Sequence, residues 1–184
     1  QDFMVVSQNS YATDAGYQIL KEGGNAIDAA VAIGFVLAVT LPRAGNIGGG
    51  GFMLIYTADS QEVSAIDYRS AAPVTATSEM YLTESGVVRF GHLVNAVPGS
   101  VAGLLKAHKK YGKLSLKEVL RPAIELASKG FPVPHDLNYV LNWAKGSMLD
   151  NNASKKKFYN SKDNPLPIAS IFTQPKLART LNLI

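Results

Sequence analysis

Apolar residues along the chain follow helical spacing in some segments and short continuous runs in others. At residues 12–20 they recur every three to four positions and stop at the two glycines 23–24, which predicts an amphipathic helix ended by glycine. Residues 26–40 are apolar almost all round. Asn25 is placed to cap this second helix and Asp28 to complete a capping box, so a helix buried between layers is predicted.

Two short apolar runs, residues 52–57 and 62–67, are separated by a four-residue connection, which predicts a β-hairpin. Residues 4–6 are a further, shorter strand candidate. Because both strands of the hairpin and the preceding helix are mostly apolar, the pattern predicts an α/β (α+β) fold in which helices cover a sheet.

The second half of the chain is predicted to be mainly helical. Pro98 is placed to open a helix that ends near Gly112. Ser115 and Glu118 have the spacing of a capping box for the next helix, which Pro122 is expected to kink or to divide.

Towards the C-terminus, residues 137–144 have the apolar spacing of another amphipathic helix, and Pro175 is placed to open a last one. The segment between them, residues 150–167, is rich in Asn, Lys, Ser and Pro. This composition predicts a long polar surface loop.

Composition narrows the possible functions. The 184 residues are 47% hydrophobic and 17% charged, as in a folded protein. The absence of cysteine excludes a disulfide framework, a thiol nucleophile and zinc sites that use sulfur. The longest apolar run, residues 29–39, is too short to span a bilayer, so no membrane span is predicted in this chain.

The net charge is +4, and the basic clusters at residues 109–110 and 155–157 are not interleaved with aromatic residues. This pattern favours a solvated surface over nucleic-acid binding. Residues 1–3 contain neither the charged nor the apolar region of a signal peptide. Any signal peptide is therefore expected to be absent already.

Four successive glycines at residues 48–51 are the most unusual local feature. A phosphate-binding loop needs a helix after it, whereas Phe52 and a predicted strand follow here. The run therefore favours a close approach of backbone to backbone, or of backbone to a substrate, where a Cβ would clash.

Arg69 lies just after the second predicted strand, and a guanidinium binds a carboxylate through two parallel hydrogen bonds. The residues alone favour a structural ion pair with Asp67 or Glu62, with carboxylate binding as the alternative. The three histidines stand singly, and no Gly-x-Ser-x-Gly sequence is present. The sequence therefore predicts no metal site and no hydrolase triad.

Five segments in series closely resemble the γ-glutamyltransferase family. They are GGNAIDAAVA at residues 23–32, AGNIGGGGFML at 44–54, IDYR at 66–69, VPGSVAG at 97–103 and PAIELA at 122–127. The resemblance covers essentially the whole chain. Ser70 is a departure, because many members of the family carry Glu after the arginine.

The resemblance implies the N-terminal-nucleophile fold, a four-layer αββα sandwich. In that family the precursor cuts itself into two subunits, and the new N-terminal threonine of the small subunit is the nucleophile. Residues 1–184 resemble the N-terminal portion of the large subunit, a single incomplete domain that supplies helices and part of one sheet. The small subunit is absent.

The activity implied is transfer and hydrolysis of γ-glutamyl groups from glutathione and related compounds. Arg69 matches the arginine that binds the α-carboxylate of the γ-glutamyl group, which overturns the ion-pair interpretation. The resemblance places no catalytic residue in this chain and implies no cofactor and no metal.

The implied partners are the small subunit, glutathione, and amino-acid or peptide acceptors, and the expected location is periplasmic or secreted. The alternatives are a related acylase, of the cephalosporin acylase or γ-polyglutamate transpeptidase type, and a non-catalytic homologue.

Overall fold

The computed structural model describes residues 3–83, 86–87 and 91–184, so Gln1 and Asp2 lie outside the described residues. The helices are α1 (Ser10–Lys21), α2 (Ala26–Thr40), α3 (Ser100–Tyr111), α4 (Leu116–Lys129), α5 (His135–Trp143), α6 (Lys145–Leu149), α7 (Asn152–Phe158) and α8 (Pro175–Leu181), with 3₁₀ turns η1 (Ser78–Tyr81) and η2 (His92–Val94). The strands are β1 (Phe52–Thr57), β2 (Glu62–Asp67), β3 (Leu82–Thr83), β4 (Gly86–Val87), β5 (Phe131–Pro132) and β6 (Ile171–Phe172).

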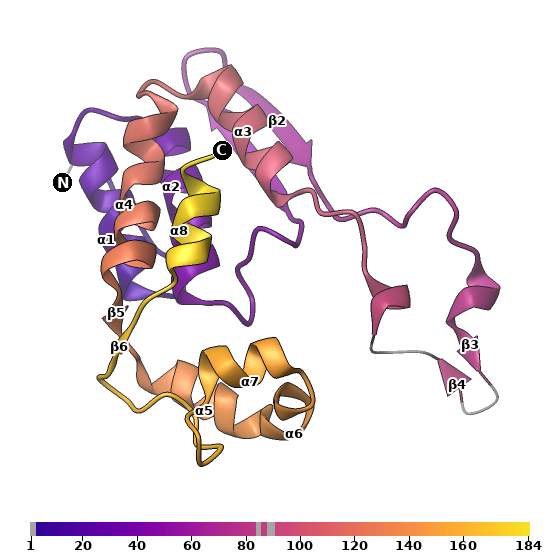
Figure 1. Ribbon diagram of the computed structural model, residues 1–184. Coiled ribbons are helices and arrows are strands. Elements are labelled where there is room, and N and C mark those ends of the chain that lie inside the picture. The colour runs from indigo at the N-terminus through magenta and orange to yellow at the C-terminus, as the bar shows by residue number, and fades with distance from the viewer. Residues whose placement is uncertain (1–2, 84–85, 88–90) are drawn as a thin grey trace.

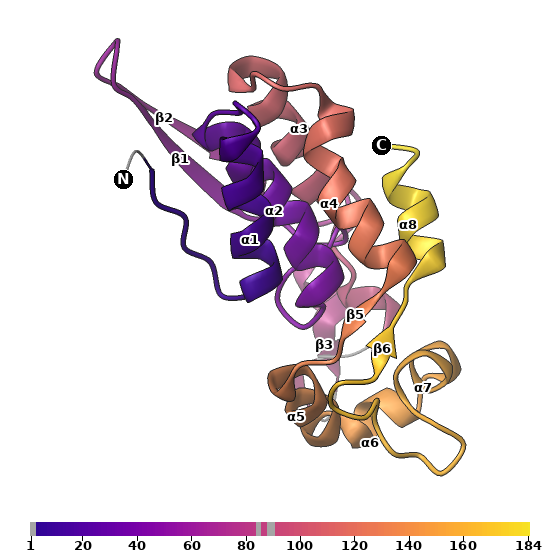
Figure 2. The ribbon, with the colours of Figure 1, turned by 90° about the vertical axis from the view of Figure 1, so that its left-hand side faces the viewer.

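The long helices form one layer beside the β1–β2 hairpin. Figure 2 shows α1, α2, α4 and α8 side by side in this order, so α2 lies between two neighbours. This position explains why α2 is apolar on nearly every side, and Val31, Phe35 and Val39 are fully buried. In Figure 1, α5, α6 and α7 form a separate lobe, and β3 and β4 lie on an arm that extends away from the helices.

The capping box predicted for α2 is confirmed and extends beyond its own helix. Asn25 Oδ1 accepts the N–H groups of Ile27 and Asp28, and Asp28 Oδ2 accepts the N–H of Asn25 at 2.9 Å. The fully buried Asp28 carboxylate also accepts the N–H groups of Lys113 at 3.0 Å and Leu114 at 3.2 Å. One carboxylate therefore joins the start of α2 to the turn between α3 and α4.

The β1–β2 hairpin has the predicted boundaries, with Phe52 opposite Asp67 and Thr57 opposite Glu62. One face packs towards α3 and the helical layer, where the side chains of Ile55 and Ile66 are buried. The other face is exposed and carries Phe52, Leu54, Tyr56, Val63, Ala65 and, at its end, Asp67, with Leu54 exposed at 77%. Helices therefore cover only one face of the hairpin in this chain.

Helix α4 is continuous through Pro122, so the proline does not divide it. Its predicted capping box is present: Ser115 Oγ accepts the N–H of Glu118 at 3.3 Å, and Glu118 Oε2 accepts the N–H of Ser115 at 2.8 Å. The predicted helices that begin near Pro98 and at Pro175 are also confirmed, as α3 and α8.

The strand expected at residues 4–6 is wrong. These residues have no strand partner in the part of the chain that the structure describes, and Met4 and Val6 are exposed at 83% and 81%. An apolar run becomes a strand only where a neighbouring strand satisfies its backbone hydrogen bonds, and no described segment does so here.

The long loop expected at residues 150–167 is also wrong in its first half, because α7 occupies it. Asn151 Oδ1 accepts the N–H of Ser154 at 3.0 Å and caps this helix. The ring of Phe158 packs on that of Phe172, with centroids 5.5 Å apart. The polar composition of the segment therefore did not reveal α7, which Asn151 caps and whose last residue, Phe158, packs against β6.

The two capping boxes give a matched pair for measuring the role of Asp28. In the full-length protein we expect Asp28→Asn to lower the free energy of unfolding by about 2–4 kcal/mol, because an amide nitrogen would face buried N–H donors. Glu118→Gln makes the same change at an exposed capping box and should have a much smaller effect. Denaturant unfolding of both variants measures the difference, and equal losses would contradict the structural role of Asp28.

Candidate functional site

Backbone hydrogen bonds hold the segment around Arg69 on both sides. Gly51 and Tyr68 exchange N–H···O bonds of 3.0 and 3.3 Å, which extend the β1–β2 hairpin by one residue pair. Ala71 and Val97 exchange a second pair of 3.1 and 2.8 Å. Arg69 therefore lies between two antiparallel bridges, which fix the path of its backbone.

The glycine run at residues 48–51 crosses the backbone of residues 68–70 in close contact. A Cβ on Gly50 would lie 2.3 Å from the backbone nitrogen of Ser70 and 2.7 Å from the carbonyl oxygen of Tyr68. No side chain larger than hydrogen fits there. The predicted close approach of backbone to backbone is confirmed at this position, and β1 follows the run, as expected for a loop that does not bind phosphate.

The same loop holds the start of α3. The carbonyl oxygen of Gly49 accepts the N–H groups of Gly99 at 2.8 Å and Ser100 at 3.0 Å. A cavity of about 140 Å³ lies beneath the loop, between α2 and the residues Tyr68 and Ser100. The glycine loop, the end of β2 and the start of α3 therefore meet at one crossing.

The side chain of Arg69 is exposed and has no ion pair or hydrogen bond with any residue that the structure describes. Neither of the two expected ion pairs forms. Asp67 accepts the backbone N–H of Arg69 at 2.9 Å, and Glu62 is not paired with the guanidinium. Arg43 and Arg179 are likewise exposed and unpaired among described residues, and Arg179 lies in helix α8. Arg69 differs from both because it lies at the crossing of the glycine loop, the end of β2 and the start of α3.

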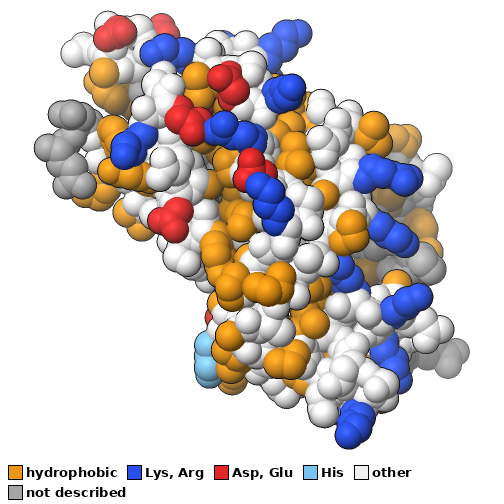
Figure 3. All heavy atoms as spheres, turned by 60° about the vertical axis from the view of Figure 1, so that its left-hand side comes forward, with side chains coloured by type: hydrophobic (Ala, Val, Ile, Leu, Met, Phe, Trp, Pro, Cys, Tyr) orange, Lys and Arg blue, Asp and Glu red, His pale blue; other side chains and the backbone are white. Residues whose placement is uncertain are grey.

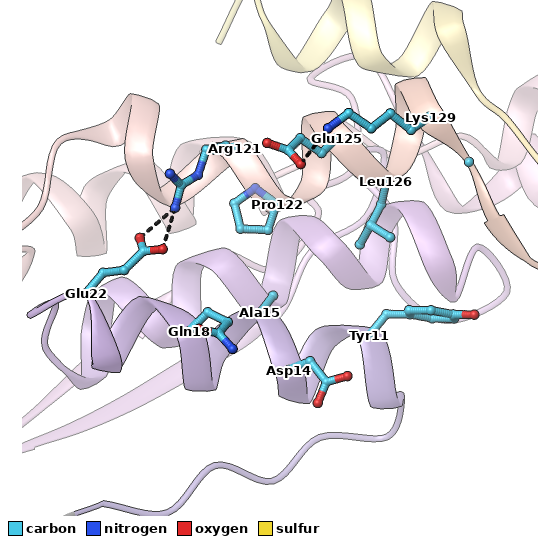
Figure 4. Close-up of a pocket in the computed structure, with 11 residues that line it drawn as sticks. Tyr11, Asp14, Ala15, Gln18, Glu22, Arg121, Pro122, Glu125, Leu126 and Lys129 are labelled. Carbon is cyan, nitrogen blue, oxygen red and sulfur yellow. Dashed lines mark hydrogen bonds and ion pairs between the residues drawn. The ribbon is translucent and has the colours of Figure 1, made fainter.

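A larger groove of about 480 Å³ lies between α1 and α4 and has a different character (Figure 4). Arg121 Nη2 contacts both carboxylate oxygens of Glu22 at 2.7 and 2.6 Å, and Lys129 Nζ contacts Glu125 at 3.0 Å. These cations are neutralised within the groove. The geometry therefore favours Arg69 over Arg121 as a carboxylate-binding group.

The side chain of His108 contacts the turn between α3 and α4 and the buried Asp28. Its Nε2 lies 2.9 Å from the carbonyl oxygen of Leu114 and 3.6 Å from Asp28 Oδ1.

Within residues 3–83, 86–87 and 91–184, no group of three His, Cys, Asp or Glu side chains is arranged to hold a metal ion. In the same residues, no helix is both long enough and apolar enough to cross a membrane.

The surface charge is unevenly distributed. On the face seen in Figure 3, the acidic side chains gather in the upper half, whereas the lower right carries lysine and arginine. The last forty residues contain seven Lys or Arg and two Asp or Glu, so they account for the positive net charge. Lys155 is paired with Asp163 at 2.8 Å. The solvated surface remains the prediction for this region.

Tyr68 is the residue that sequence reasoning passed over. It is half-buried beside Arg69, and burial raises the pKa of its phenol above the ordinary value. The sequence contains a signal for it, because Ser64, Ile66 and Tyr68 continue the inward positions of β2 with a period of two.

Comparisons with known proteins identify the family of this chain. The family model for γ-glutamyltranspeptidase matches residues 12–184. A glutathione hydrolase proenzyme of Escherichia coli is 42% identical over 186 residues, covering 98% of this chain and 32% of its own length. A glutathione hydrolase proenzyme of Bacillus subtilis is 40% identical over 100% of this chain and 32% of its own length.

Solved structures give the same result. γ-Glutamyltranspeptidase of Helicobacter pylori matches with a TM-score of 0.93 and 42% identity, over 99% of this chain and 53% of that one. Cephalosporin acylase of Bacillus halodurans matches with a TM-score of 0.83 and 29% identity, over 94% of this chain and 33% of that one. The α+β fold of the N-terminal-nucleophile type is confirmed by these relatives. The chain spans about a third of the length of the curated relatives above, and it belongs to the γ-glutamyltranspeptidase family.

Proposed function

We propose that the full-length protein transfers and hydrolyses γ-glutamyl groups of glutathione and related compounds, and that Arg69 binds the α-carboxylate of the γ-glutamyl group. The observation that carries the proposal is the exposed Arg69 guanidinium, unpaired among described residues, on a backbone held by bridges on both sides. The proenzymes that match this chain are named glutathione hydrolases, which supports the substrate class.

The nucleophile of this reaction is an N-terminal threonine in a small subunit outside residues 1–184. Its hydroxyl attacks the γ-carbonyl carbon, and its own α-amine takes the hydroxyl proton and passes it to the leaving nitrogen. The C–N bond then breaks, the free amine departs, and a γ-glutamyl ester forms. Water then releases glutamate, or an amino acid or peptide amine takes the acyl group. Residues 1–184 alone are therefore expected to be inactive.

The contribution of this chain is positioning. A guanidinium presents a planar set of donors that fits a carboxylate with two parallel hydrogen bonds. When Arg69 holds the α-carboxylate, the distance along the glutamyl side chain fixes where the γ-carbonyl lies relative to the nucleophile. Arg69 thus selects substrates that carry a free α-carboxylate. No metal ion or organic cofactor takes part in these steps.

The partners in this proposal are the small subunit, glutathione as donor, and amino acids or peptides as acceptors. The proposed location is periplasmic or secreted. The large share of the relatives' length that lies beyond this chain is consistent with a second subunit.

The preference for one acyl group over another is the first property to test, because a cephalosporin acylase and the transpeptidase CapD of Bacillus anthracis share the fold at 29% and 34% identity. We expect the full-length, self-cleaved protein to release the anilide from a γ-glutamyl anilide and to leave a glutaryl cephalosporin essentially intact. The reverse preference would replace the proposed function with an acylase function. Turnover of neither compound by a correctly cleaved protein would favour a non-catalytic homologue.

Arg69→Ala should lower kcat/KM for the γ-glutamyl anilide by about 30- to 1000-fold, equivalent to roughly 2–4 kcal/mol, because a charge-assisted contact made through two hydrogen bonds is lost. Arg69→Lys should recover only part of this loss, since an ammonium keeps the charge without the planar geometry. Arg179→Ala, which removes another exposed and unpaired guanidinium, is the matched control and should leave kcat/KM unchanged. Self-cleavage should proceed in all three variants, because that step uses no bound γ-glutamyl group.

A further inference from the structure

Three glycines surround Tyr68, and a Cβ at any of their positions would clash with it. A Cβ on Gly103 would lie 2.1 Å from Cγ and 2.2 Å from Cβ of Tyr68, and one on Gly51 would lie 2.8 Å from Cε2 of the same ring. A Cβ on Gly99 would lie 2.1 Å from the carbonyl oxygen of Tyr68. The ring and the backbone of Tyr68 are therefore both held by close contact, mainly with the start of α3.

The inward position of Tyr68 determines the outward position of its neighbour. Along the end of β2, Ile66 is buried, Asp67 is exposed, Tyr68 is half-buried and Arg69 is exposed. Successive side chains of an extended segment point to opposite faces. While the ring of Tyr68 stays between the hairpin and α3, the side chain of Arg69 has to leave on the solvent side.

We propose that Tyr68 is a positioning residue for Arg69, an inference that rests on the proposed role of Arg69 as the α-carboxylate anchor. Tyr68 does not touch the substrate. An arginine side chain is long, so a small rotation of the backbone at Arg69 produces a large displacement of the guanidinium. A misplacement of about 1 Å lowers the rate of a reaction that depends on positioning by roughly 100-fold.

The ring of Tyr68, and not its hydroxyl, is the part that acts. The hydroxyl has no hydrogen bond with any residue that the structure describes, whereas the ring and Cβ make the close contacts with Gly51 and Gly103. Tyr68→Phe should therefore keep the function of this residue. Tyr68→Leu should lose it, because a leucine does not fill the space of the ring.

The test uses the full-length, self-cleaved protein and measures the inhibition constant of L-glutamate, an α-carboxylate ligand that does not react. We expect Tyr68→Leu and Gly103→Ala to weaken L-glutamate binding by about 10- to 100-fold, as for the loss of a hydrogen bond to a charged group. Tyr68→Phe should stay within about twofold of the wild type. Gly146→Ala in α6, where a Cβ meets no atom within 4 Å, is the matched glycine control and should bind normally.

A double variant separates positioning from a general structural role. If Tyr68 acts through Arg69, adding Tyr68→Leu to Arg69→Ala should cause no further loss of L-glutamate binding. Additive losses would overturn the inference, as would unchanged binding in Tyr68→Leu. If Gly103→Ala does not fold, Tyr68→Leu decides the question, because it removes atoms from the crossing and adds none.

The same set of variants distinguishes this inference from the proposed function. Arg69→Ala with wild-type affinity for L-glutamate would overturn the proposed role of Arg69 itself. Weakened binding in Arg69→Ala together with normal binding in Tyr68→Leu would leave that role intact and remove only the positioning by Tyr68.

Discussion

The arrangement of this chain depends on a steric constraint at one crossing, where the glycine loop, the end of β2 and the start of α3 meet without room for a Cβ. Gly50 lies against the backbone of Tyr68 and Ser70, and Gly99 lies against the carbonyl oxygen of Tyr68. Because the contacts are between backbones, their geometry does not depend on side-chain rotamers. A glycine-rich sequence, usually associated with flexibility, here produces a tightly defined position for Arg69.

Helix α3 connects this crossing to the interior because it is anchored at both ends. At its start, Gly49 accepts the N–H groups of the first residues. At its end, Asn25 Nδ2 donates to the carbonyl oxygen of Tyr111 at 2.6 Å, and the hydroxyl of Tyr111 is bonded to Ser64 Oγ at 2.9 Å. The buried Asp28 carboxylate holds the following turn. The position of α3 against the hairpin, and with it the setting of Arg69, therefore depends on residues at the start of α2.

The sequence predicted those parts of the fold that local chemistry determines. The spacing of apolar residues identified α1, α2, α3, α4 and the β1–β2 hairpin. Capping added to the prediction for α2 and α4, because Asn25 and Ser115 cap helices within their own segments. It failed at α7, where the polar composition of the segment hid a local cap by Asn151 and where Phe158 packs on the distant Phe172. It also failed at residues 4–6, which lack a strand partner among the described residues.

The candidate site was predictable in part. The glycine run and Arg69 stood out as residue types, but the sequence could not show that they touch, nor that Asp67 binds the backbone of Arg69 and leaves its guanidinium unpaired. Residue chemistry alone favoured an ion pair, and the resemblance to the family reversed that preference. Tyr68 was missed because an aromatic residue at the end of a strand is ordinary until its glycine neighbours are seen.

The central claim is that Arg69 recognises the α-carboxylate, and a second substrate tests it most directly. Compare kcat/KM of the wild type and Arg69→Ala for a γ-glutamyl anilide and for its analogue that lacks the α-carboxylate. The account predicts that the analogue is a poor substrate for the wild type and no poorer for Arg69→Ala, since the contact is already missing. If the substitution reduces kcat/KM equally for both compounds, Arg69 supports the structure and does not bind the carboxylate.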